Sequence, residues 1–371
     1  MRARTATTVV FFATGAVFAS WAARTPAIQD KLDLSAGELA IAILGIEGGA
    51  VLGLPLGGAL ATRLGSRWTL RIGFVLYPAG MVAVGAAPSL AALTAALALT
   101  TAATSLNDVA MNVQGVELER RARRPVMSRL HAGHSFGVLA GALIGTAAAA
   151  AGVSVATHFT GVAAAGLIGG LLATLWLVDE PREAGTPLVA RPSGALAGLA
   201  AIAFCCFLIE GAAIQWSAVH LRGEGAGEGV AAAAFATFAL AVAAGRLAGD
   251  RIVDRLGRAR TVRAAGLVAA AGFTLAIVAP SPGPALVAWA VTGAGVALVA
   301  PTVLGAAPLI GDLRPPVAIA AVTTVGYLGS FTGPPAIGAL AELTSLPAAL
   351  AVGVAAAAAI ALLAPASLRR A

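Results

Sequence analysis

Twelve apolar segments of about 20 residues each restrict the folds open to this 371-residue chain. A helix needs about 20 mainly apolar residues to cross a hydrocarbon core of about 30 Å. The sequence does not show the alternating pattern of barrel strands, which argues against a β-barrel. We therefore expect an all-α integral membrane protein with twelve transmembrane helices. The predicted spans are residues 5–23, 38–60, 69–88, 90–118, 132–151, 155–178, 195–219, 230–250, 262–279, 285–305, 317–340 and 347–365.

The placement of the basic residues predicts an orientation in the membrane. The chain is 59% hydrophobic and only 11% charged, yet its net charge is +7. If the N-terminus is inside, 20 of the 24 basic residues fall on the cytoplasmic side. This distribution follows the positive-inside rule. It predicts that both termini are cytoplasmic. It also explains the basic net charge by the orientation of the chain in the lipid bilayer, so we expect no nucleic acid as a partner.

An internal repeat divides the chain into halves. The segment "GLPLGGALATRLGSRWTLR" (53–71) and the segment "GRLAGDRIVDRLGRARTVR" (245–263) share seven identical residues at a constant offset of 192. Between the halves lies a polar stretch that contains Pro and Gly. We expect an N-terminal six-helix bundle at residues 1–178, a cytoplasmic linker at 179–194 and a C-terminal six-helix bundle at 195–371. Parallel repeats of this kind place a substrate site between the halves, near the middle of the membrane.

Small residues repeat every fourth position in four spans of the two halves. The second span has Gly45, Gly49, Gly53 and Gly57, and the fifth has Gly133, Gly137, Gly141 and Gly145. The eighth and eleventh spans carry similar ladders. Such ridges let helix backbones approach closely. We expect them to mark seams along which the halves move, although general close packing explains any single ladder.

The loops and several longer stretches resemble a known family. The loop "GALATRLGSR" (58–67) and its echo "DRIVDRLGRAR" (250–260) resemble the loops after helices 2 and 8 of the major facilitator superfamily. Four further stretches resemble its fucose-permease-like branch, especially YbjJ-like bacterial proteins: "ASWAARTPAIQDKL" (19–32), "NDVAMNVQGVELERRARRPVMSRLHAGHSFG" (107–137), "EGAAIQWSAVHL" (210–221) and "GYLGSFTGPPAIG" (326–338). The resemblance implies a bacterial inner-membrane transporter with two gating loops. The residues it assigns to these loops are Arg63, Gly65, Arg67, Asp254, Arg255, Gly257 and Arg258.

This sequence also departs from the pattern of the family. Thr62 stands where the first loop usually has an acid, although Asp254 keeps that acid in the second loop. The first span lacks the proton-coupling acid of fucose permeases, so their coupling scheme does not transfer. Gln215 stands where YbjJ-like proteins usually have an acid before a Trp.

The fourth span ends in an unusually polar segment, "SLNDVAMNVQGVELERRARR" (105–124). Asp108 lies well inside the hydrocarbon, where an acid is costly unless it faces protein or water. Asp108 and Asn112 are four residues apart and share a helix face, which we expect to line a central cavity. Asn107 is a third candidate from this segment. The alternative is a structural hydrogen bond between helices.

Other spans supply further candidates for binding substrate or protons. Glu47 lies within the second span between glycines, and its alternative role is a structural pairing with a neighbouring helix. Trp21 and Trp216 are candidates for an outer gate or a sugar-stacking surface, or else belong to an aromatic belt. His134 and Tyr327 have ordinary alternatives in a helix-end hydrogen bond and in packing. The remaining candidates are Arg24, Glu210 and Gln215.

Together these features predict a secondary active transporter that works by alternating access. We expect proton-coupled uptake of a sugar-like or small polar compound by a monomer. The alternatives are export of a hydrophobic, drug-like compound by proton antiport, and a membrane sensor that does not transport. A nucleotide-binding motif is missing from the sequence, so ATP is not expected to drive the protein. We expect no cofactor, no metal site and no enzymatic activity.

Overall fold

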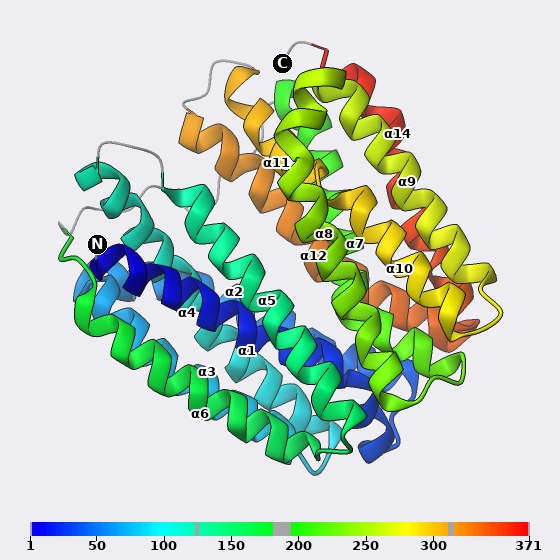
Figure 1. Cartoon of the computed structure of the whole chain (residues 1–371), viewed down its shortest axis with the longest axis horizontal. Helices are drawn as coiled ribbons and strands as arrows, with labels where there is room; N and C mark the ends of the chain where they lie inside the picture. The colour runs from blue at the N-terminus through cyan, green and yellow to red at the C-terminus, as the bar shows by residue number, and fades with distance from the viewer. Residues whose placement is uncertain (1, 123–125, 181–193, 311–314, 370–371) are drawn as a thin grey trace. The chain divides into compact units, whose positions relative to one another are not determined.

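The computed structural model describes all residues except 1, 123–125, 181–193, 311–314 and 370–371 (Figure 1). The described residues form helices, turns and short connections, without a strand. Eleven helical segments are long and apolar enough to cross a membrane by length and composition, and α12 (Pro315–Leu343) is a further 29-residue helix. The protein is thus an all-α membrane protein, as the sequence predicts.

The chain separates into two compact units. Unit 1 comprises Met1–Leu34 and Ile41–Thr186, and unit 2 comprises Ser35–Ala40 and Pro187–Ala371. The helices of unit 1 are α1 (Arg2–Leu32), most of α2 (Ala36–Leu64), α3 (Ser66–Ala86), α4 (Leu90–Ala122), α5 (Met127–Ala150) and α6 (Val155–Ala173). Most of the predicted linker, residues 181–193, lies outside the described residues.

Unit 2 contains the second set of spans. Its long helices are α7 (Ala197–Gly223), α8 (Glu228–Leu256), α9 (Arg258–Val278) and α12. Two further spans are interrupted: α10 (Pro282–Val296) continues into α11 (Val299–Ala306), and the short α13 (Leu346–Ala349) precedes α14 (Ala351–Ser367).

Ten of the predicted spans correspond to one α-helix each and the two interrupted spans to two each, and most of the long helices extend beyond the apolar window. The largest difference is at α1, which was predicted to end at residue 23 and continues to Leu32 through Pro26. The charges after residue 23 end the apolar run, but they do not end the helix. Lys31 holds this extension in place, because its Nζ donates to the carbonyl oxygens of Gly85 and Ala87 at the end of α3, both at 3.1 Å.

The glycine ladder of α2 packs against α4, within unit 1. A Cβ at Gly45, Gly49 or Gly53 would overlap the backbone of α4 at Thr94, Ala98 or Ala102. The backbones of the two helices therefore touch along this stripe. The prediction that the ladder marks a seam between halves is wrong for α2, because its glycines face a helix of the same unit.

The ladders of α5 and α8 also face helices of their own units. Gly137 and Gly141 of α5 lie against the carbonyl groups of Phe12 and Ala16 in α1, and Figure 1 shows α5 beside α1. In unit 2, Gly245 and Gly249 of α8 face Ala297 and Leu298, at the break between α10 and α11. At the two ends of the α12 ladder, Gly326 faces Phe207 of α7, and Gly338 faces both Trp216 of α7 and Ala40 of α2. The ladders of α5 and α8 are therefore internal packing surfaces, which allow close contact where apolar burial does not drive helices together.

The repeated loops adopt the same backbone conformation in both units. Gly65 has φ 86° and ψ 158° before α3, and Gly257 has φ 75° and ψ 158° before α9. Positive φ favours glycine over residues with a Cβ. The shared glycine of the two loops is thus explained by backbone geometry, and the structural repeat agrees with the sequence repeat.

Candidate functional site

Asp108 lies near the middle of α4, 18 residues after Leu90 and 14 before Ala122. At about 1.5 Å per residue, its Cα is roughly 20 Å or more from either end of the helix. Its side chain is half-buried. A carboxyl group at this depth is rare in a membrane helix and is most often functional.

Tyr77 of α3 is a buried polar group in this region that the sequence reasoning missed. Its buried hydroxyl donates to the carbonyl oxygen of Thr14 in α1, at 3.3 Å. Thr104 and Asp108 of α4 are near enough to this hydroxyl to affect it electrostatically. Three helices, α1, α3 and α4, therefore meet at a polar cluster inside unit 1. Tyr77 is one of only two tyrosines in the chain, and this rarity was a signal available from the sequence.

Asn112 connects the region of Asp108 to α5. Its Nδ2 donates to the backbone oxygen of Asp108 at 2.8 Å, so its Oδ1 is left to accept. His131 Nε2 lies 3.2 Å from that Oδ1 and must be the donor, because an amide oxygen only accepts. The edge of the Phe11 ring contacts the His131 ring, with centroids 5.2 Å apart. His131 is thus the histidine that joins this cluster.

His134, the histidine predicted as a candidate, lies one turn further along α5. Its side chain is half-buried. A Cβ at Gly15 of α1 would overlap the backbone oxygen of His134, so the two helices touch here.

Asn107 is adjacent to Asp108 in sequence but faces a different helix. It is fully buried, and a Cβ at Gly73 of α3 would overlap its Oδ1. Neither its amide oxygen nor its amide nitrogen has a hydrogen-bond partner among the described residues. The structure thus places Asn107 on the α3 side of α4 rather than beside Asn112.

Glu47 is the second acid within the spans of unit 1. It lies 11 residues after the start of α2 and is half-buried. Its Oε2 is buried and has no hydrogen-bond partner among the described residues. The glycines on either side of it, Gly45 and Gly49, face α4.

Trp21 and Arg24 are buried inside unit 1. Trp21 is 3% exposed and belongs to an apolar core with Val17, Tyr77 and Phe159. The Arg24 guanidinium is also buried and donates to the carbonyl oxygen of Val153 at 2.7 Å. Both residues lie in the interior of this unit rather than on an exposed aromatic belt.

In unit 2, Glu210 of α7 forms an ion pair with Arg246 of α8, with Oε1 and Nη2 3.3 Å apart. Both side chains are partly exposed, at 27% and 39%. Tyr327 of α12 is exposed and stacks on Phe331, with ring centroids 6.1 Å apart. It also contacts Phe207 of α7 at 5.7 Å. Glu210 is therefore charge-paired, and Tyr327 stands in an aromatic group.

Gln215 and Trp216 are buried further along α7. The Trp216 indole Nε1 donates to the backbone oxygen of Pro334 in α12 at 3.0 Å. Pro335 has no N–H, so it cannot donate to the backbone oxygen of residue 331 as a regular helix residue would. Trp216 thus ties α7 to the part of α12 that contains two adjacent prolines.

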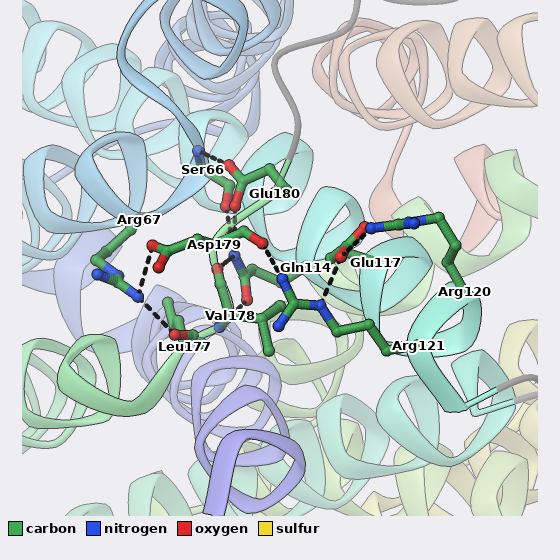
Figure 2. Close-up of polar contacts among 10 residues, drawn as sticks. All are labelled: Ser66, Arg67, Gln114, Glu117, Arg120, Arg121, Leu177, Val178, Asp179 and Glu180. Carbon is green, nitrogen blue, oxygen red and sulfur yellow. Dashed lines mark hydrogen bonds and ion pairs between the residues drawn. The ribbon is translucent and has the colours of Figure 1, made fainter.

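The first predicted gating loop is part of a hydrogen-bond network centred on Gln114 (Figure 2). Gln114 Nε2 lies 2.7 Å from Ser66 Oγ, 2.8 Å from the Val178 oxygen and 2.9 Å from Glu180 Oε2. Its Oε1 accepts from the Val178 nitrogen at 3.0 Å. Glu180 Oε1 also accepts from the Ser66 nitrogen at 2.5 Å, at the start of α3. We call these four residues the Gln114 network.

Charged side chains surround the Gln114 network. Arg67 forms an ion pair with Asp179 at 3.0 Å and donates to the Leu177 oxygen at 2.6 Å. Glu117 is buried and accepts from Arg120 and Arg121 at 2.6 to 2.8 Å. Figure 2 shows these groups joining the ends of α3 and α4 to residues 177–180.

The remaining loop residues lie closer to the surface. Arg63 is exposed at the end of α2. In the second loop, Asp254 and Arg255 are exposed and Arg258 is half-buried. In the second repeat, Arg258 and Ala306 stand at the positions of Ser66 and Gln114 in the first, so the side chains of the Gln114 network are not repeated in the sequence.

The fold and these sites define a multi-pass membrane protein of two repeated helical units with partly exposed ionisable groups at mid-helix. The family model described as Major Facilitator Superfamily matches residues 6–220. The chain therefore belongs to the Major Facilitator Superfamily of transporters.

Relatives and solved structures agree with this assignment. The chain is 31% identical over 353 residues to the membrane protein MosC of Rhizobium meliloti, covering 93% of this chain and 85% of that one. It is 32% identical over 347 residues to an uncharacterized MFS-type transporter of Yersinia pestis, covering 92% and 90%. Among solved structures, a D-xylose-proton symporter has a TM-score of 0.79 at 15% identity, covering 100% and 97%. The nucleoside transporter NupG has a TM-score of 0.73 at 14% identity, covering 99% of this chain and 98% of that one.

Proposed function

We propose that this protein takes up a sugar-like or other small polar solute together with protons. The observation that carries the proposal is Asp108, a half-buried carboxyl group near the middle of α4. An acid at this depth exchanges protons only if water reaches it in some state of the protein. In alternating access, that exposure changes sides during each cycle.

The contacts around Asp108 support its role in coupling. Asn112 binds the backbone of Asp108 and also His131, so a change in the position of α5 reaches the coupling helix directly. The solved structures that share the fold include a proton symporter for D-xylose and a nucleoside transporter. Their substrates are small polar solutes of the proposed kind.

We also propose that the arginine-rich helix ends and both termini face the cytoplasm of a bacterial cell, and that a monomer suffices for transport. The positive-inside distribution supports this orientation. In a background without Cys205 and Cys206, a cysteine replacing exposed Gly223 should react with an impermeant thiol reagent on intact cells. A cysteine replacing exposed Thr62 should not react. The opposite labelling pattern would overturn the orientation.

The function is tested in liposomes that contain the purified protein and the trapped pH indicator pyranine. D-xylose, L-fucose, D-glucose and uridine are added outside, one at a time, with no initial pH gradient. Symport acidifies the interior, because protons enter with the solute. Proton antiport makes it alkaline, and uncoupled transport leaves its pH unchanged.

The variant Asp108→Asn keeps the shape of the side chain and removes its titration. We expect it to lose solute-driven acidification while it still exchanges internal for external labelled solute. Asp33→Asn is a matched control, because Asp33 is an exposed acid in the turn after α1. Full acidification by the Asp108 variant would show that another group carries the proton, and Glu47→Gln would then be tested in the same assay.

A further inference from the structure

A half-exposed surface of unit 2 combines three aromatic rings with an ion pair. We call it the aromatic surface and define it by Phe207, Glu210, Arg246, Tyr327 and Phe331. Phe207 and Glu210 are three residues apart on α7 and so lie on one helix face, with Cβ atoms about 5–6 Å apart. Tyr327 joins the set through its contacts with the Phe207 and Phe331 rings.

The aromatic surface lies near the middle of its helices. Glu210 is 13 residues from Ala197 and 13 from Gly223, so it is about 20 Å from each end of α7. Tyr327 is 12 residues after Pro315 and 16 before Leu343. An ion pair whose side chains are 27% and 39% exposed at this depth is too costly in contact with lipid tails. This surface must therefore face water or a ligand.

The packing of α12 against α7 holds the rings outward. Gly326 and Gly329 of α12 face Phe207 and Phe204 of α7, and a Cβ at Gly329 would overlap the Phe204 carbonyl group. Because the glycine side of α12 is pressed against α7, these contacts fix the helix from which Tyr327 and Phe331 project. Tyr327 remains 46% exposed. A ring held in this way loses little conformational freedom when a ligand stacks on it.

The charge of the aromatic surface indicates what it binds. Among the described residues of unit 2, Glu210 and Arg246 are the acidic and the basic residue near the middle of the spans. They form an ion pair, so their charges neutralise each other. The surface therefore offers no net charge to attract an ion. It does offer carboxylate acceptors and guanidinium donors beside an aromatic platform. This combination suits a flat, uncharged ring that carries hydroxyl groups.

We propose that the aromatic surface binds the transported solute, and that this solute is an uncharged hydroxylated ring. Its apolar ring face stacks on Tyr327, and its hydroxyl groups bind Glu210 and Arg246. Monosaccharides and nucleosides share this chemistry. The inference rests on the proposed transport function, but it concerns binding and does not require proton coupling.

The test is equilibrium dialysis of the purified protein with radiolabelled D-xylose, D-glucose, uridine and adenosine, without any gradient. D-glucuronate and uridine monophosphate serve as charged counterparts. We expect at least one uncharged compound to bind at millimolar concentration or below, and the charged counterparts to bind more weakly. Binding of the sugars alone or of the nucleosides alone identifies the source of the ring.

Variants test whether this binding takes place on the aromatic surface. Tyr327→Ala should weaken it by about tenfold, as expected for a lost stacking contact, and Tyr327→Phe should keep most of it. Leu328→Ala is the matched control, because Leu328 is 50% exposed on the same helix and lies outside the aromatic surface. Tyr327→Phe also guards against misfolding, since it preserves the ring packing.

Three results would overturn the proposal. They are failure of every uncharged ring to bind, preferred binding of the charged counterparts, and equal effects of Tyr327→Ala and Leu328→Ala. If a solute still drives acidification but its binding does not depend on Tyr327, the proposal about the aromatic surface is refuted and the proposed transport stands. If binding depends on Tyr327 but no solute moves protons, the aromatic surface stands and the proton coupling fails.

Discussion

Replacing Gln114 by Leu tests whether the Gln114 network holds the end of unit 1 together. Leu has a similar volume but can make none of the four contacts of the amide, which lie between 2.7 and 3.0 Å. The variant leaves the Val178 nitrogen and oxygen without their partner. It also removes the amide donor from Ser66 Oγ and from the Glu180 carboxylate.

The expected loss of stability follows from the number of polar groups that lose a hydrogen-bond partner. A buried polar group left without its hydrogen bond costs about 1–3 kcal/mol. Val178 is half-buried and Glu180 keeps its bond to the Ser66 nitrogen, so water and the remaining contact offset part of the cost. The net destabilisation should be about 2–4 kcal/mol. For a unit of this size, that corresponds to a fall in the apparent melting temperature of roughly 5–15 °C.

The assay is scanning fluorimetry of the purified protein in one detergent, with wild type and variants at equal concentration. Val116→Ala is the control, because Val116 lies two residues away on α4 and is exposed. It should melt close to wild type. If Gln114→Leu also melts within about 2 °C of wild type, the amide contacts do not stabilise unit 1 and the reasoning is refuted.

Two further predictions concern close packing inside unit 1. Gly137→Ala should lower the melting temperature, because the added methyl group overlaps the Phe12 carbonyl group and overpacking costs about 1–3 kcal/mol. Gly161→Ala meets nothing within 4 Å and should be neutral or stabilising, so equal effects of the two changes would contradict the packing argument. Gly73→Ala should destabilise through its overlap with Asn107 Oδ1, and adding Asn107→Ala should restore part of the loss. Strictly additive losses in the double variant would show that the two residues do not interact.

The number and order of the spans were predictable because they depend on local apolar content. About twenty mainly apolar residues in a row have few alternatives to a membrane helix, and the paired loops revealed the repeat. The end of α1 was not predictable in this way. Its last turns are fixed by Lys31, whose partners at Gly85 and Ala87 are distant in sequence.

The polar end of α4 shows why the candidate site was only partly predictable. Helical spacing groups Asp108 with Asn112, but it does not say which neighbouring helix each face meets. Asn107 and Gln114 are seven residues apart and both face α3, at Gly73 and Ser66. One polar segment thus serves two purposes: Asn107 and Gln114 pack on α3, while Asp108 supplies the acid and Asn112 links it to His131. The sequence contains no sign of the Val178 and Glu180 contacts, because they depend on where α6 ends.

The pairing of helices by glycine contacts has a consequence for biosynthesis. Within unit 1, α2 meets its close partner as soon as α4 has been made, whereas α1 must wait for Gly137 and Gly141 of α5. During translation α1 therefore remains in the membrane without that partner for more than 100 residues of further synthesis. The inner pair α2–α4 should assemble first and the outer pair α1–α5 should close around it. In unit 2 the same nesting recurs, with α8 meeting the α10–α11 span before α7 meets α12. A ribosome stalled before residue 137 should thus leave α1 accessible to crosslinking by the insertion machinery, and one stalled well after α5 should not.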